Sequence, residues 1–217
     1  MHDEDVQRKV DQLARELDEA AVALVRDYVL LDEAGRARFT GREFELLGGG
    51  GDRQEAAHQF TTDDLTALAL LGVPVSGAAA LELLDDRHAR WSNLLSEIDV
   101  LEDPSTAAER HQLTDDSSAA HHLWSAVKAV PTMGATRTGK LLARKRPMLL
   151  PVYDSVVEAA ISPGDAWWRI IAAFWADEGR LDALERVRRG AGATDVLSPL
   201  RTLDVVLWMR YRGPIEG

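Results

Sequence analysis

Residues 134–157, GATRTGKLLARKRPMLLPVYDSVV, carry five cations with no acidic residue among them, between two signals for a change of chain direction. The turn-forming sequence VPTMG precedes them at residues 130–134, and helix-compatible residues continue from about Thr136 to Pro147. Pro151 and Asp154 then mark the start of the next helix, because proline suits a first turn and aspartate is a common N-cap. The stretch therefore predicts two consecutive helices joined by a short connection.

Apolar residues elsewhere recur with the spacing of amphipathic helices. Near the N-terminus, steps of three or four residues separate Val6, Val10, Leu13, Leu17, Ala20, Leu24 and Tyr28, which predicts one helix over residues 4–31. The sequence contains no convincing alternating strand pattern and no internal repeat. It predicts an all-α protein: a single globular domain, residues 1–217, of about eight to ten helices, with the helix at 4–31 as an appended element.

The composition is that of a globular protein with an acidic balance. The 217 residues include no cysteine and carry a formal net charge of −11, so disulfides and thiolate chemistry are excluded. The charged N-terminus lacks the apolar core of a signal peptide, and no apolar run approaches the roughly 20 residues of a membrane span. We expect a cytoplasmic protein that does not contact a membrane, and its oligomeric state stays open.

Three further segments carry local signals. Four consecutive glycines at residues 48–51 predict a flexible loop and not a phosphate cradle, since no Lys-Ser/Thr pair follows them. Thr61 and Asp64 have the spacing of a capping box, and Ser198 followed by Pro199 has that of a helix start.

The basic segment and Asp154 form the candidate site. A helix N-terminus after a glycine-containing turn presents free N–H groups and suits a phosphate. The expected nucleic-acid or anion contacts are Gly134, Thr136, Arg137, Lys140, Arg144, Lys145, Arg146 and Tyr153. Two alternatives stay open for the cations, which can form a solvated face or pair with the chain's own acids. Asp154 is the candidate catalytic carboxylate, and the alternative for it is a helix cap.

Four segments resemble an uncharacterised family of high-GC bacteria, a domain of unknown function. They are FTGREFELLGGGGD, TTDDLTALALLGV, GKLLARKRPMLLPVYDSVV and LRTLDVVLWM. The resemblance covers nearly the whole chain, and the KRPxLxPVYDxVV core carries most of its specificity. It implies membership of the family and no particular activity.

A second resemblance, limited to residues 130–155, implies a chemistry. VPTMG is similar to the L-P-G-V-G hairpin of helix-hairpin-helix DNA glycosylases, and VYDS is similar to the V-D-T segment that holds their catalytic carboxylate. The resemblance implies that hairpin amides bind a DNA phosphate, and that Asp154 stabilises the cationic sugar or activates water once a base is flipped. Thr132 stands where the motif has glycine, and Tyr153 is inserted before Asp154.

Together, these observations predict a nucleic-acid-binding protein with a helix-hairpin-helix, glycosylase-like core and DNA as its partner. The alternative is a non-catalytic helical module whose basic segment binds an acidic protein or a small anion. A third option is an enzyme acting on a small phosphorylated or carboxylated metabolite. No cofactor or metal ion is expected in any of these cases.

Overall fold

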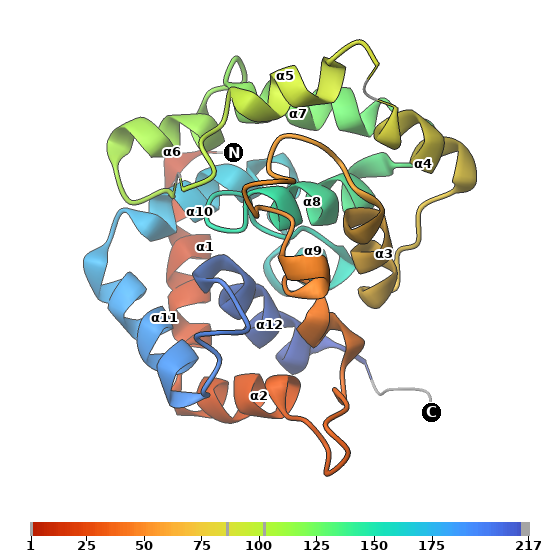
Figure 1. The fold of residues 1–217 in the computed structure, drawn as a ribbon. Helices are drawn as coiled ribbons and strands as arrows, with labels where there is room; N and C mark the ends of the chain where they lie inside the picture. The colour runs from red at the N-terminus through yellow and green to blue at the C-terminus, as the bar shows by residue number, and fades with distance from the viewer. Residues whose placement is uncertain (1, 86, 102, 214–217) are drawn as a thin grey trace.

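Twelve α-helices and three short 3₁₀ helices account for the regular structure of residues 2–85, 87–101 and 103–213, the part of the chain that the computed structural model describes (Figure 1). In order, the α-helices are α1 (Asp3–Glu16), α2 (Glu19–Val29), α3 (Thr62–Leu70), α4 (Gly77–Leu84), α5 (Arg90–Ser96), α6 (Ala107–Thr114), α7 (Ala119–Lys128), α8 (Gly134–Lys145), α9 (Ser155–Ile161), α10 (Trp167–Trp175), α11 (Glu178–Gly190) and α12 (Pro199–Tyr211). The 3₁₀ helices are η1 (Thr40–Glu43), η2 (Leu47–Gly49) and η3 (Gly164–Ala166). Within these residues, β-pairing is limited to one isolated bridge between Leu31 and Ala37, which confirms the all-α class.

The N- and C-terminal helices pack together, and the middle of the chain forms a second group beside them. In the terminal group, α1 lies against α9 and α10, while α2 lies against α11 and α12. In the central group, α3 packs on α8, and α7 contacts α5, α6 and α8. Figure 1 shows the terminal helices in red and blue and most of the central helices in yellow and green. Among the residues described, no helix combines the length and the apolar character needed to cross a bilayer.

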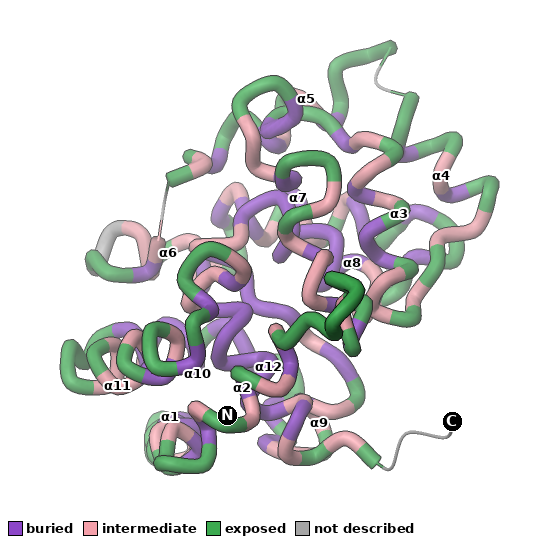
Figure 2. Tube along the Cα trace, turned by 60° about the horizontal axis from the view of Figure 1, so that its bottom comes forward, coloured by how far each residue is buried: buried purple, intermediate pink, exposed green. Residues whose placement is uncertain are grey.

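Helices α8 and α12 run through the interior of the molecule. All eight residues from Thr138 to Lys145 in α8 are buried, as are nine residues of α12 between Leu200 and Met209. In Figure 2 both helices are drawn largely in purple, the colour of buried residues. Since burying an unpaired polar group is costly, the charged residues on these two helices must find partners inside the protein.

The N-terminal apolar stripe is divided between two helices, so the expectation of one helix over 4–31 is wrong. α1 ends at Glu16, and the Asp18 carboxylate caps α2 by accepting from the backbone N–H groups of Ala20 and Ala21. Arg210 of α12 fixes the break, because its guanidinium lies 3.0 Å from Glu16 and 2.7 Å from Asp18. A stripe of three- and four-residue steps continues across such a kink, so periodicity alone did not reveal it.

Two other local expectations are confirmed. Thr61 and Asp64 form the reciprocal capping box of α3, and the hydroxyl of Ser198 caps α12, which has Pro199 in its first turn.

The buried carboxylate of Asp64 organises the central group. Its Oδ1 accepts from Nε of Arg144 at 2.8 Å, and its Oδ2 lies 3.2 Å from Nζ of Lys145; all three side chains are fully buried. The same guanidinium donates to the carbonyl oxygens of Phe44 and Leu47. Asp64 therefore joins α3 to the end of α8 and, through Arg144, to the loop before η2.

Lys145 and Arg146 hold the rest of that loop by its carbonyl groups. Nζ of Lys145 donates to the carbonyl oxygens of Gly51 at 2.5 Å and Ala56 at 2.7 Å. Arg146 donates to the carbonyl oxygens of Ala57 and Ile98 at 3.0 and 3.1 Å. The glycine segment expected to be flexible is thus tied to α8, and an added Cβ at Gly51 would lie 2.7 Å from Arg144.

Replacing Asp64 by asparagine should destabilise the fold strongly, because it leaves two buried cations without their carboxylate. Breaking a buried pair by removing one partner costs about 3–5 kcal/mol. Urea unfolding of Asp64→Asn measures the loss. The matched control is Asp63→Asn, whose half-exposed carboxylate meets Arg53 at 3.3 Å, and whose loss should stay below about 1 kcal/mol. Equal losses in the two variants would contradict the role given to Asp64.

Candidate functional site

The hairpin between α7 and α8 has a left-handed backbone at two positions. Thr132 has a φ of 72° and Gly134 a φ of 59°. For a β-branched residue such as Thr132 this conformation is a genuine outlier, and the surroundings must hold it. The Thr132 hydroxyl lies 2.7 Å from that of Ser76, and Arg137 donates to the carbonyl oxygens of Thr132 and Pro74 at 3.0 and 2.9 Å.

The first turn of α8 follows directly and is accessible. Gly134 is exposed, and Thr136 and Arg137 are half-buried. Met133, at the N-cap, makes no side-chain hydrogen bond to the helix. The N–H groups of this turn therefore have no side-chain cap and are available for a phosphate contact.

The eight residues expected to bind an anion lie in four different places. Gly134, Thr136 and Arg137 lie at the hairpin, and Lys140 lies one turn further along α8 with 6% of its surface exposed. Arg144, Lys145 and Arg146 are between 0 and 1% exposed and donate to the protein's own backbone. Tyr153 is half-buried, and its hydroxyl donates to Glu158 at 2.8 Å. A basic surface along the whole of residues 137–146 is therefore absent, since its last three cations are interior.

Asp154 caps α9 and also meets Lys140. Its Oδ1 accepts from the N–H groups of Val156 and Val157 at 2.9 and 3.1 Å. Its Oδ2 lies 3.3 Å from Nζ of Lys140, and only 8% of the residue is exposed. Lys140 is placed to donate to the carbonyl oxygen of Leu71 as well, at 3.4 Å. Capping α9 therefore uses one carboxylate oxygen of Asp154. The other oxygen faces a cation, so the cap does not exclude a catalytic role for this carboxylate.

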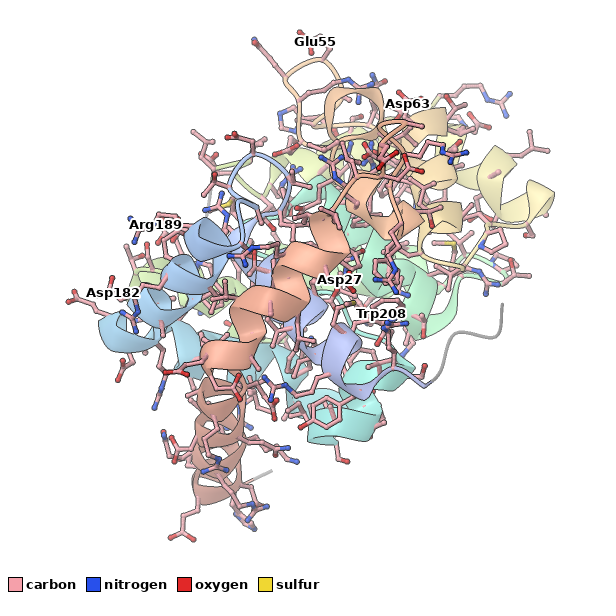
Figure 3. The ribbon with its side chains drawn as sticks, turned by 90° about the horizontal axis from the view of Figure 1, so that it is seen from below. Asp27, Glu55, Asp63, Asp182, Arg189 and Trp208 are labelled. Atoms are coloured by element: carbon pink, nitrogen blue, oxygen red, sulfur yellow. The ribbon has the colours of Figure 1, made fainter. Side chains whose placement is uncertain are left out.

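Lys140 and Asp154 line a cavity of about 470 Å³ between the central and terminal helices. We call it the Lys140–Asp154 pocket. Its other walls come from the end of α2, the segment leading into η1, the end of α3, and α12 with the residues after it. They are Tyr28, Arg38, Phe39, Thr40, Gly41, Leu70, Leu71, Gly72, Arg201, Trp208, Arg212 and Gly213. In Figure 3 the label of Trp208 marks the α12 side of this pocket.

Aromatic rings form one part of its wall. The rings of Tyr28 and Phe39 stack at 5.5 Å, and Trp208 meets Phe39 edge-to-face at 5.5 Å. The guanidinium of Arg212 lies 5.0 Å from the ring centres of both Phe39 and Trp208. These contacts give the pocket flat apolar surfaces beside cations, a combination that suits a flat ring attached to an anionic group.

A second cation, the buried Arg201, also lines the Lys140–Asp154 pocket. Its guanidinium pairs with Asp204 one turn along α12 and donates to the hydroxyl of Tyr28 at 2.6 Å. Burial is also the main reason that the pKa of Tyr28 lies above 10.0, since the nearby Arg201 acts in the opposite direction. The hydroxyl of Tyr28 thus stays protonated at neutral pH.

Burial lowers the pKa of Lys140 below the ordinary 10.5, and the charge of Asp154 opposes this effect. Within the described residues, the ammonium group is within reach of the carboxylate of Asp154 at 3.3 Å and the carbonyl oxygen of Leu71 at 3.4 Å. An anion entering the pocket would supply a further negative charge. Among the residues described, no group of three or more histidine, aspartate or glutamate side chains is arranged to hold a metal ion.

Sequence reasoning missed the residues that complete the pocket. Tyr28, Phe39, Arg201, Trp208 and Arg212 lie far from residues 134–157 in the chain. One signal was present, since Arg201 and Asp204 are a charged pair at i and i+3 in an otherwise apolar segment. Such a pair indicates that charged side chains are buried, but it does not indicate which cavity they border.

The fold and the pocket define an all-helical protein with an ion-paired cavity between its terminal and central helices. The chain belongs to a family of unknown function, DUF6308, whose model matches residues 21–211. That range begins inside α2 and includes both Lys140 and Asp154. No curated protein and no solved structure matches the chain.

Replacing Thr132 by glycine should leave the protein equally stable or up to about 1 kcal/mol more stable, because glycine adopts a positive φ without the cost borne by a β-branched residue. Thr132→Val keeps that cost and loses the contact with Ser76, so its free energy of unfolding should fall by about 0.5–1.5 kcal/mol. Chemical denaturation of both variants gives the comparison. A valine variant more stable than the glycine variant would show that the hairpin is not strained.

Proposed function

We propose that this protein binds nucleic acid and that the Lys140–Asp154 pocket receives a nucleotide turned out of a duplex. The observation that carries the proposal is the 3.3 Å pair of Lys140 and Asp154 on the wall of a cavity that also presents aromatic rings. A flipped nucleotide needs a pocket with flat apolar walls for the base and polar groups near the sugar and phosphate. A volume of about 470 Å³ is within the range of small-ligand sites.

The hairpin between α7 and α8, residues 130–134, is a second observation that supports the proposal. The motif L-P-G-V-G has glycine at its third and fifth positions, which correspond to Thr132 and Gly134, and these are the hairpin residues with positive φ. The uncapped N–H groups of α8 are the groups that would contact a DNA phosphate. Arg137 supports the turn through two carbonyl groups and adds a positive charge beside it.

In the catalytic form of the proposal, Asp154 acts on the sugar of the flipped nucleotide. As the bond between C1′ and the base breaks, the base leaves with the electron pair and takes up a proton, while positive charge develops on the sugar. The carboxylate of Asp154 stabilises that charge and accepts a proton from the water whose oxygen bonds to C1′. The two N–H bonds to Oδ1 fix the orientation of this carboxylate.

The buried cations Arg144, Lys145 and Arg146 have a different part in this proposal. Their hydrogen bonds to carbonyl groups hold the end of α8, and with it the position of Lys140. The direct contacts with the ligand then come from Gly134, Thr136, Arg137 and Lys140.

A second candidate function is binding of a small anion without catalysis. Four cations line the pocket, namely Arg38, Lys140, Arg201 and Arg212, against the single carboxylate of Asp154. Asp27, Asp154 and Asp204 pair with three of these cations. Arg212 makes no ion pair with the described residues, and in a chain with a net charge of −11 this one unbalanced cation favours an anionic ligand. A cavity of about 470 Å³ suits a small anion better than the acidic surface of a protein partner.

Binding to duplex, mismatched and abasic-site DNA over a salt series tests the proposal. We expect salt-sensitive binding that weakens in Lys140→Gln and persists in Asp154→Asn, because asparagine also caps helices. Base release by Asp154→Asn should fall by about 10²-fold or more. Arg189→Gln, which removes an exposed cation of α11 labelled in Figure 3, is the matched control and should behave as the wild type.

The outcomes separate the two functions. Absence of DNA binding at low salt, where phosphate contacts are strongest, would overturn the nucleic-acid proposal. Binding of free inorganic anions that is lost in Lys140→Gln, without DNA binding, would establish the second function. DNA binding with unchanged base release in Asp154→Asn would remove the catalytic form alone.

Anion affinity at this pocket should depend on pH in a direction set by Lys140. Because burial lowers the pKa of Lys140 from 10.5, its ammonium loses charge at a lower pH than an exposed lysine does. Affinity for sulfate, whose charge is constant from neutral pH upward, should therefore fall as pH rises through that lowered pKa. Calorimetric titration between neutral pH and 10.5 measures the effect, and Lys140→Arg should flatten the profile. A flat profile in the wild type would contradict a contact between Lys140 and the anion.

A further inference from the structure

A second cavity, of about 320 Å³, shares no lining residue with the Lys140–Asp154 pocket. Its walls come from α6, α7, the first turn of α8 and the segment from η3 into α10. Tyr153 lines it, whereas the next residue, Asp154, lines the first pocket. Successive side chains of an extended segment point to opposite sides, so residues 152–154 separate the two cavities. The volume suits one mononucleotide-sized ligand.

Aromatic rings meet at steep angles, 66° and 75°, in this cavity. The ring of Trp168 lies edge-to-face with Trp124 at 5.5 Å and with His121 at 4.5 Å. Burial lowers the pKa of His121, and Nδ1 of this residue lies 3.0 Å from the hydroxyl of Ser118. The imidazole is therefore a neutral ring at neutral pH. Rings arranged in this way offer stacking and edge contacts to a flat heteroaromatic group.

Two indole N–H groups in the cavity have no hydrogen-bond partner within the described residues. Trp168 is 9% exposed and Trp124 is half-buried, yet neither indole donates to any group in that part of the chain. By contrast, the indole of the adjacent Trp167 donates to the carbonyl oxygen of Val152 at 2.9 Å. Neither nitrogen is among the buried side-chain atoms that lack a partner, so both N–H groups reach solvent. They are therefore free to donate to a bound ligand that carries acceptor atoms.

Charges of opposite sign lie at the two ends of α7. Lys128, in the last turn, is exposed and makes no ion pair with the described residues, and Ala135 of the uncapped first turn of α8 also lines the cavity. Asp116 precedes α7 and lies 3.7 Å from His121. A helix of ten residues spans about 15 Å. Lys128 and Asp116 are therefore far enough apart for one nucleotide to lie between them.

We propose that this second cavity binds a nucleotide whose base carries an exocyclic amine, such as cytosine. The ring lies against Trp124 and Trp168, and the 5′-phosphate lies against Lys128 and the first turn of α8. The amine donates to the carboxylate of Asp165 or Asp116, because carboxylates are acceptors that distinguish an amine from a carbonyl oxygen. The site takes the class of ligand named in the proposed function, but it does not depend on Asp154 or on base release.

Calorimetric titration with dCMP and dUMP tests the proposal, because these nucleotides differ only at the C4–N3 edge of the base: dCMP has an amine and an acceptor nitrogen there, and dUMP has a carbonyl oxygen and an N–H donor. We expect dCMP to bind more tightly than dUMP, and deoxyribose 5-phosphate to bind weakly. Lys128→Gln should weaken dCMP about tenfold through the lost charged contact. Asp165→Asn, on the exposed rim, should reduce the preference for dCMP, and Trp124→Leu should weaken all nucleotides. Arg189→Gln is the control and should leave every affinity unchanged.

Each contrary result overturns the proposal. Equal affinities for dCMP and dUMP would remove the assigned base class, and unchanged binding in Lys128→Gln would remove the phosphate position. Loss of dCMP binding in Lys140→Gln but not in Lys128→Gln would place the nucleotide in the first pocket instead. If Trp124→Leu does not fold, Lys128→Gln and Asp165→Asn still decide the matter, since both side chains are exposed.

A further comparison identifies the source of the nucleotide. A duplex with a single bulged cytosine is titrated beside the same duplex without the bulge and beside free dCMP. Preference for the bulged duplex, lost in Lys128→Gln, assigns the cavity to an unpaired base within DNA. Binding of free dCMP alone assigns it to a free nucleotide and leaves the test of the proposed function, base release by Asp154, independent of this result.

Discussion

The central half of the molecule depends on one buried carboxylate, that of Asp64. It neutralises two cations at the end of α8, and their remaining N–H groups hold the loop from Phe44 to Ala56 by its carbonyl oxygens. Buried ion pairs are stable only where the surrounding hydrogen bonds are complete. The chain meets this requirement with a loop that has no α-helix or strand, because its carbonyl oxygens are free to accept from the buried cations. The positions of α8 and of this loop therefore depend on each other.

That arrangement explains how an acidic protein can contain a strongly basic segment without showing a basic surface there. The three consecutive cations after Ala143 are in the interior, whereas the accessible positive charge lies at the hairpin and around the Lys140–Asp154 pocket. A single helix, α8, thus serves two purposes along its length. Its first half faces solvent and a cavity, and its last turn is a cross-link between α3 and the loop.

Local chemistry was sufficient to predict the helical class and the capping box of Thr61 and Asp64, and to offer a helix cap as the alternative role of Asp154, because each depends on residues within four positions of one another. The burial of Arg144, Lys145 and Arg146 was not predictable in that way. Their acceptors are backbone carbonyls, which every residue possesses and no sequence pattern marks. The pocket was hidden for a related reason, since Tyr28 and Arg201 meet Lys140 only after the two ends of the chain have packed together.

The short extended segment at residues 152–154 has a thermodynamic consequence. It is a common wall between two cavities, with Tyr153 on one side and Asp154 on the other, and it is held by the indole of Trp167 and by the cap of α9. A displacement of this wall changes the shape of both cavities at once. Any occupant that shifts it in one cavity alters affinity in the other, and linkage requires that the second occupant return the effect by the same factor.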